Sequence, residues 1–119
     1  MSGLTTHILD LTHGKPAANV KVDLYVVTEA SGILEYRKSV VTNDDGRLDT
    51  PLLVEDEMKV GEYELVFYVG EYFRAKEMEL TEPHFLERVP VRFCISDVEA
   101  HYHVPLLVSP WGYQVYRGS

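Results

Sequence analysis

Cysteine is nearly absent from this sequence, and long hydrophobic runs do not occur in it. Cys94 is the only cysteine among 119 residues, so no disulfide can form within the chain, and nothing points to an oxidising compartment. No apolar run approaches the roughly 20 residues that a membrane-spanning helix needs. Residues 1–7 lack the basic and apolar regions of a signal peptide. We therefore expect a soluble, cytoplasmic protein with no membrane partner.

Basic residues are also scarce. The chain has 11 Lys and Arg against 19 Asp and Glu, a formal net charge of −8. Nucleic acids are bound through clustered Lys and Arg, and anionic membrane surfaces attract basic segments, so neither partner is expected. The hydrophobic share of 45% with 25% charged residues is typical of a globular protein. The length predicts a single domain over residues 1–119.

What the sequence does contain is a repeated alternation of apolar and polar residues, which predicts β-strands. Turn-forming segments rich in Gly, Pro, Asn and Asp separate the alternating runs. Residues 70–76 are the only segment that is typical of a helix. The predicted strands cover residues 5–11, 20–26, 63–69, 89–95, 102–108 and 112–116, with one more from about residue 33 to the turn at 42–46. We predict an all-β fold, an antiparallel β-sandwich of seven to eight strands with one short helix.

The last two predicted strands indicate where a site could lie. If Tyr102 and Val104 face the core, then His101 and His103 face outward. In the final strand the same rule turns Tyr113 and Val115 inward and Gln114 and Tyr116 outward. A flat sheet face forms no pocket by itself, so a site there needs a second subunit laid across it, which predicts an oligomer.

Each candidate residue has a structural interpretation beside a functional one. His101 and His103 could chelate a metal, but no third ligand at metal spacing accompanies them, and two surface histidines are the commoner outcome; one of them could also be a general acid or base. His7 stands alone in a predicted strand, where a structural role is commoner. Arg47 follows an Asp-Gly turn, where it is either a solvated charge or a planar cation for an anionic ligand. Cys94 is expected to be a buried or interface thiol.

Three segments carry a resemblance to a known family. They are LTTHILD with GKPA at 4–17, TNDDGR at 42–47, and YHVPLLVSPWGY at 102–113 followed by the terminal YRGS at 116–119. The sequence resembles the transthyretin-like family, and within it the 5-hydroxyisourate hydrolases. The terminal Tyr-Arg-Gly-Ser and the two histidines separate the hydrolases from the hormone-carrying transthyretins.

The resemblance implies a fold, an assembly and a reaction. The fold is an eight-stranded sandwich that forms a homotetramer, a dimer of dimers, with active sites in the channel between the dimers. The reaction is hydrolysis of a cyclic amide of 5-hydroxyisourate to 2-oxo-4-hydroxy-4-carboxy-5-ureidoimidazoline, in urate (purine) catabolism. No cofactor and no metal is expected. The location would be cytoplasmic, or peroxisomal in a eukaryote.

Carried over by position, the family's catalytic residues fall on His7, Arg47 and His103. Substrate binding falls on His7 and Arg47 together with Tyr116 and Ser119. His101 does not match a catalytic position and is left out, and which histidine acts as the general base stays open. The alternative function is that of a non-enzymatic, transthyretin-like carrier of small ligands.

Overall fold

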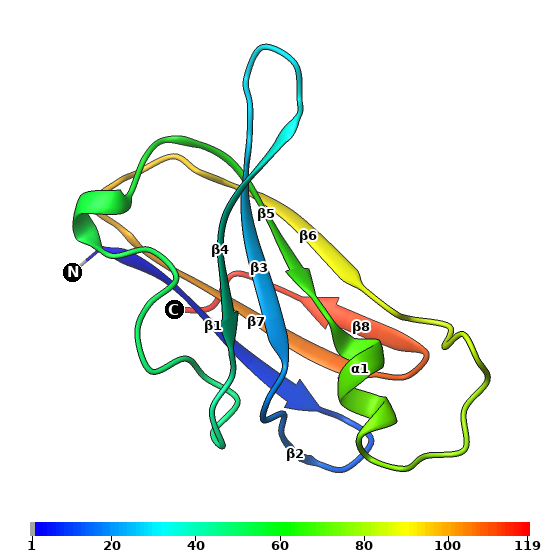
Figure 1. The fold of residues 1–119 in the computed structure, drawn as a ribbon. Coiled ribbons are helices and arrows are strands. Elements are labelled where there is room, and N and C mark those ends of the chain that lie inside the picture. Colours follow the sequence, from blue (N-terminus) through cyan, green and yellow to red (C-terminus); the bar gives the residue numbers. More distant parts are fainter. Residues whose placement is uncertain (1) are drawn as a thin grey trace.

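Two four-stranded sheets pack face to face in the structure, a computed structural model that describes residues 2–119 (Figure 1). The strands are β1 (Gly3–Asp10), β2 (Lys15–Pro16), β3 (Lys21–Val27), β4 (Leu34–Val41), β5 (Gly61–Phe67), β6 (Val89–Ile95), β7 (His101–Ser109) and β8 (Gly112–Val115). The one α-helix among the described residues, α1 (Val69–Arg74), follows β5, and a 3₁₀ turn, η1 (Glu55–Glu57), precedes β5. The predicted β-sandwich with one short helix is confirmed. None of the helices described is long and apolar enough to cross a membrane.

The order of the strands explains how distant parts of the chain meet. One sheet has the order β2-β1-β7-β8 and the other β4-β3-β5-β6. All neighbouring strands are antiparallel except β1 and β7, which run parallel and pair residue by residue from Gly3 with His101 to Asp10 with Val108. The predicted antiparallel sandwich therefore has this one parallel pair as an exception. It is this pair that aligns residues near the two ends of the chain.

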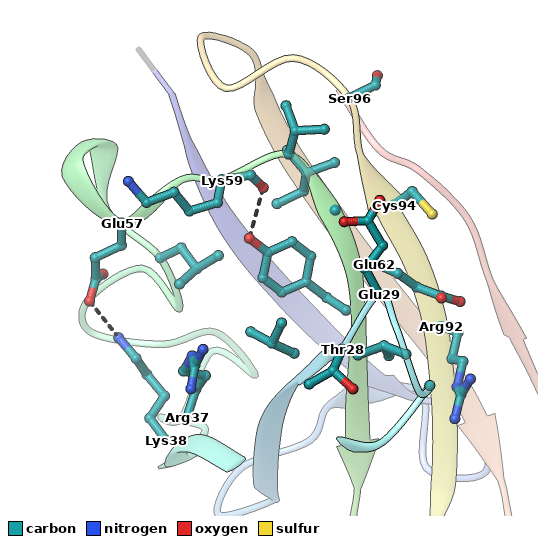
Figure 2. A pocket seen from close by; sticks show the side chains of 18 residues that line it. Thr28, Glu29, Arg37, Lys38, Glu57, Lys59, Glu62, Arg92, Cys94 and Ser96 are labelled. Atoms are coloured by element: carbon teal, nitrogen blue, oxygen red, sulfur yellow. Dashed lines mark hydrogen bonds and ion pairs between the residues drawn. The ribbon is translucent and has the colours of Figure 1, made fainter. Parts of the chain in front are cut away.

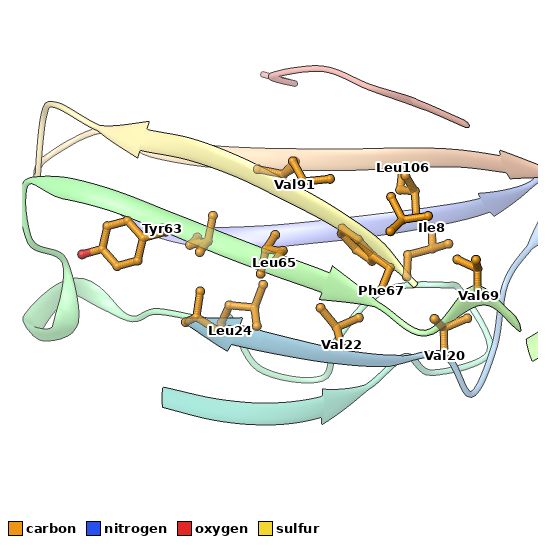
Figure 3. Packing of buried hydrophobic residues seen from close by; sticks show 14 of the residues in the cluster. Ile8, Val20, Val22, Leu24, Tyr63, Leu65, Phe67, Val69, Val91 and Leu106 are labelled. Atoms are coloured by element: carbon orange, nitrogen blue, oxygen red, sulfur yellow. The ribbon is translucent and has the colours of Figure 1, made fainter. Parts of the chain in front are cut away.

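The core lies between the sheets and is formed by the apolar residues of the alternating runs. Figure 3 shows side chains of β3 and β5 meeting those of β1 and β7. Leu24, Leu65, Phe67, Ile8 and Leu106 are all fully buried. Burying one such side chain contributes about 1.5–3 kcal/mol, so the alternation that predicted the strands is also what holds the sheets together. Its consequence is that the opposite faces are left for polar residues.

A β-bulge lies in β4 beside β3. Leu24 pairs with Lys38 and Tyr25 with Tyr36, so Arg37 is the extra residue of β4. The pairing of β3 with β5 is unbroken, with Val26 opposite the buried Tyr63. Val26 packs against the core on the predicted face, although it is only partly buried near the end of the strand.

Two further expectations are corrected by the structure, and another holds only in part. Val69, predicted as the end of a strand, is the first residue of α1. Tyr113 lies opposite the buried Val108, on the predicted inward face, yet it is 44% exposed because β8 is a short strand at the edge of its sheet. Cys94 is exposed on the outer side of β6, so a buried thiol is ruled out. The predicted outward positions of His101 and Tyr116 hold, since both are exposed.

A buried carboxylate joins the end of β1 to α1. Asp10 accepts hydrogen bonds from the Tyr72 hydroxyl at 2.7 Å, from the backbone of Thr12 at 2.9 Å and from Nδ1 of His13 at 2.5 Å. Burial by itself raises the pKa of Asp10, but the hydrogen bonds from Tyr72 and His13 outweigh it and leave the pKa below its usual value. This contact fixes the end of β1, the strand that carries His7.

Candidate active site

A hollow of about 1020 Å³ lies at the end of the sandwich, between the β3–β4 hairpin and β5–β6 (Figure 2). Its charged groups largely neutralise one another: Figure 2 shows Lys38 directed at Glu57, 3.4 Å away. Arg92 on its wall likewise pairs with Glu64 at 2.6 Å. None of the residues described along its walls is a histidine. It therefore lacks a side chain that exchanges protons readily near neutral pH.

Another, smaller hollow of about 270 Å³ lies over the outward face of the β2-β1-β7-β8 sheet. Its walls are formed by Thr5, Thr6, Arg47, Leu48, His101, His103 and Ser119. Three of the five residues that the sequence predicted, Arg47, His103 and Ser119, thus meet in one pocket. They come from the loop after β4, from β7 and from the end of the chain.

His103 is held by the neighbouring strand. The parallel pairing sets Thr5 of β1 opposite His103 of β7, and the Thr5 hydroxyl lies 2.8 Å from Nδ1 of His103. Partial burial lowers the pKa of His103, and the positive charge of Arg47 and the neighbouring His101 and His7 lower it further. The imidazole is therefore neutral at neutral pH, as a general base must be.

His7 lies two residues beyond Thr5 on the same face of β1, beside the pocket rather than on its wall. Its Nε2 lies 3.0 Å from the backbone oxygen of Asp45. A carbonyl oxygen can only accept, so Nε2 carries the proton and Nδ1 carries the lone pair. Burial and Arg47 lower the pKa of His7 by more than the hydrogen bond and charge of Asp45 raise it.

Arg47 lies on a tight loop that packs closely against β1. The side-chain oxygen of Asn43 accepts hydrogen bonds from the backbone of Asp45 at 2.9 Å and of Arg47 at 3.1 Å. Gly46 has φ +72° and lies so close to β1 that a Cβ atom there would be 2.4 Å from the oxygen of Ile8, which only glycine avoids. Within residues 2–119 no carboxylate forms an ion pair with the Arg47 guanidinium, so its charge is available to a ligand.

The C-terminal segment packs directly on His103. The backbone nitrogen of Gly118 donates to the oxygen of His103 at 2.8 Å, and a Cβ atom on Gly118 would lie 2.7 Å from Cδ2 of the His103 ring. Arg117 stacks on the ring of Tyr102 at 4.1 Å. These contacts bring Ser119 to the pocket wall. Tyr116, in contrast, is 52% exposed and is not part of that wall.

Four residues of the pocket wall were not among the predicted site residues: Thr5, Thr6, Leu48 and His101. The sequence did contain a signal for two of them, since Thr5 shares a strand face with His7 and His101 shares one with His103. Among the described residues no three His, Cys, Asp or Glu side chains converge as they would around a metal ion.

Comparison with known proteins places this geometry in a family. The profile of the HIUase/Transthyretin family matches residues 4–118. The chain belongs to the HIUase/Transthyretin family. A relative named 5-hydroxyisourate hydrolase 2, from Rhizobium meliloti, is 50% identical over 117 residues, which cover 98% of this chain and 95% of the relative. The 5-hydroxyisourate hydrolase of Halalkalibacterium halodurans is 53% identical over 120 residues and is matched along the whole of both chains.

Solved structures of the family agree with the fold. The 5-hydroxyisourate hydrolase of Klebsiella pneumoniae superposes with a TM-score of 0.78 at 35% identity, over 99% of this chain and 100% of that one. Transthyretin from Sparus aurata gives 0.86 at 26% identity, over 99% and 97%. An (S)-allantoin synthase gives 0.91 at 42% identity over 99% of this chain, which spans only 44% of that longer protein. The predicted transthyretin-like fold is thereby confirmed.

Proposed function

We propose that this protein hydrolyses 5-hydroxyisourate to 2-oxo-4-hydroxy-4-carboxy-5-ureidoimidazoline by adding water to a cyclic amide. One observation carries the proposal: relatives named for this activity are 50–53% identical along essentially the whole chain. The pocket supports it independently, because it combines an imidazole of lowered pKa with a guanidinium that no carboxylate neutralises among the described residues.

His103 is the general base of this mechanism. Its imidazole is neutral at neutral pH and lines the pocket, while Nδ1 is engaged by Thr5. Nε2 takes a proton from a water molecule as the water oxygen bonds to the amide carbon. The carbon–nitrogen bond of the ring then breaks, and the proton passes from Nε2 to the leaving nitrogen. This assigns the base that the sequence left open between two histidines.

Arg47 and His7 act on the substrate, whereas His103 acts on the attacking water. The Arg47 guanidinium binds the electron-rich substrate and stabilises the negative charge that develops on the carbonyl oxygen. His7, with Nδ1 unprotonated, accepts a hydrogen bond from a ring N–H of the substrate and orients it. Ser119 borders the pocket and contributes its hydroxyl, whereas Tyr116, exposed and outside the pocket wall, contacts the substrate from beside the pocket.

The decisive experiment supplies 5-hydroxyisourate in situ from urate and urate oxidase and follows its near-ultraviolet absorbance with and without the protein, in the presence of a chelator. Decay well above the spontaneous rate is expected. Decay at the spontaneous rate from a folded protein would refute the hydrolase. Stoichiometric binding of a small apolar ligand would then favour the carrier function, since a solved relative from sea bream is a transthyretin in complex with thyroxine.

We further propose a homotetramer in the cytoplasm. Among the described strands, β6 and β8 each lie at one edge of their sheet, and such edges pair readily with a second copy of a chain. The pocket is also small and open, so a second copy across the sheet would complete its walls. Sedimentation equilibrium should give four times the mass of the chain, and a monomer at micromolar concentration would contradict the assembly.

A further inference from the structure

The hydroxyl of Thr5 lies between two imidazoles of the pocket. Its Oγ1 is 2.8 Å from Nδ1 of His103 and 3.3 Å from Nε2 of His101. The two rings are stacked, with an interplanar angle of 11° and centroids 6.4 Å apart. One threonine therefore links the histidine that we assign as the base to a histidine for which the mechanism has so far no role.

The hydrogen-bonding capacity of these groups leaves two arrangements in which the Thr5 proton is used between the rings. A hydroxyl has one proton to donate and two lone pairs, and a neutral imidazole has one N–H and one lone pair. Both rings could donate to Thr5 at once, but its proton would then have no acceptor among the described residues, since these two rings are the bonding partners of Thr5 Oγ1. Otherwise either His103 donates from Nδ1 to Thr5 and Thr5 donates to Nε2 of His101, or the chain of donors runs in the opposite direction. In the first arrangement Nε2 of His103 carries a lone pair; in the second it carries a proton and cannot act as a base.

The charge in the pocket selects the first arrangement. Arg47 shares the pocket with His103, and its positive charge favours a lone pair over an N–H at the ring edge that faces the pocket. His101 is exposed, so water can bond its other ring nitrogen in either tautomer and imposes no preference. The charged and titratable groups that face His103 from the packed elements are His7 of β1, Arg47 of the loop after β4 and His101 of β7.

We propose that Thr5 and His101 are positioning residues: the Thr5 hydroxyl accepts from Nδ1 of His103 and donates to Nε2 of His101, and so holds His103 with Nε2 unprotonated and directed at the reacting water. The inference rests on the proposed hydrolase function. It adds that His101 acts through Thr5 rather than on the substrate. In proteins generally, the hydrogen-bond partner of one ring nitrogen of a histidine sets the protonation of the other ring nitrogen.

Substitutions at Thr5 test the link by activity. Thr5→Val removes the hydroxyl and keeps the β-branched shape that suits a strand. We expect kcat to fall about 10- to 100-fold with KM nearly unchanged, because partners that orient a functional histidine contribute on that order. Thr5→Ser should restore kcat to within about threefold of the unmodified protein. Thr81→Val, in the exposed loop between α1 and β6, is the matched control and should leave kcat unchanged.

Substitutions at His101 test the other end of the link. His101→Phe keeps a flat ring without an acceptor and should lower kcat about three- to tenfold, whereas His101→Gln keeps an acceptor and should recover most of the loss. Equal kcat values for His101→Phe and the unmodified protein would remove His101 from the proposal. A loss in KM alone would point to direct substrate contact and overturn the positioning role.

The tautomer itself is measured by ¹⁵N NMR of the imidazoles without substrate. In the unmodified protein we expect His103 to be protonated at Nδ1 and bare at Nε2, with the tautomer shifting toward Nε2–H in Thr5→Val. A His103 protonated at Nε2 would overturn the proposal, and this spectrum decides the question even if Thr5→Val does not fold. Because no substrate is present, the spectrum tests the link separately from the hydrolase: a protein with the expected tautomer and no hydrolysis refutes only the proposed function.

Discussion

Replacing Gly118 by alanine should separate catalysis from stability. Gly118 lies against His103, and a Cβ atom built on it would be 2.7 Å from Cδ2 of the imidazole and 3.3 Å from Cγ of Pro105. Ordinary contacts begin near 3.4 Å, so the C-terminal segment or the ring must move by about 0.7 Å. Pro105 is buried and rigid, which leaves the imidazole and the terminal segment to absorb the movement.

The size of the effect follows from that displacement. A misplacement of about 1 Å in a catalytic geometry can lower a rate about 100-fold, so a shift of this size should reduce kcat/KM by about 10- to 100-fold. The stability should change little, because the segment adds one backbone hydrogen bond, from Gly118 to His103, with a net contribution of about 1 kcal/mol. Ordering of the terminal segment, rather than the global fold, is therefore what the substitution perturbs.

The measurement pairs the 5-hydroxyisourate decay assay with thermal unfolding. Gly112→Ala in the neighbouring turn is the matched control, because a Cβ atom there meets nothing within 4 Å, and it should retain full activity. Wild-type kcat/KM in Gly118→Ala would refute the role of the close approach to His103. A large fall in Tm would refute the claim that the effect is local.

Three further outcomes are expected. Burial and Arg47 hold the pKa values of His7 and His103 below 6.5, so both rings are neutral at neutral pH. The value of kcat/KM should therefore fall only as pH drops through those lowered pKa values. An inflection above pH 6.5 in the pH–rate profile would contradict the neutral state of the two rings. Arg47→Gln should lower kcat/KM about 100-fold and raise the pKa of His103 in an NMR titration, with little change in Tm because the side chain is exposed; an unfolded variant by circular dichroism would make the residue structural. Tyr72→Phe should lower the free energy of unfolding in urea by about 1 kcal/mol at neutral pH. The folded-state pKa of Asp10 lies below 3.8, so the stabilisation that this carboxylate contributes is present above that value and is lost as pH falls through the lowered pKa. The difference in free energy of unfolding between Tyr72→Phe and the unmodified protein should therefore shrink at low pH. A constant difference down to about pH 2 would contradict the role of the ionised Asp10 as the acceptor of the Tyr72 hydroxyl.

Most of the strands could be read from the sequence because their alternation is a local property. Val89 to Ile95 has the predicted bounds and the predicted alternation of buried and exposed residues. The errors fall where a neighbour overrides the local pattern. The parallel pairing of β1 with β7 departs from the antiparallel order, and the edge position of β8 leaves Tyr113 exposed, neither of which a single run of residues encodes.

The candidate site likewise contains residues that the motifs predicted and residues that only the packing revealed. The motifs around Arg47, His103 and Ser119 named three residues that the structure brings into one pocket, although they are far apart in the chain. Tyr116 belongs to the same C-terminal motif as Ser119 but lies outside the pocket wall. His101 was set aside for want of a motif match and nevertheless lines the pocket. Membership of a motif is a property of the sequence, whereas membership of a pocket wall depends on packing.

The sequence by itself determined the class of fold, the family and the chemical types at the site, because alternation, composition and short motifs are all carried by neighbouring residues. Only the tertiary structure decided that β1 pairs in parallel with β7, and this pairing places Thr5 beside His103, 98 residues along the chain. It also decided that Gly118 lies against the same imidazole. The register of two distant strands is set by the packing of the whole core, and from that register come the contacts that orient the base.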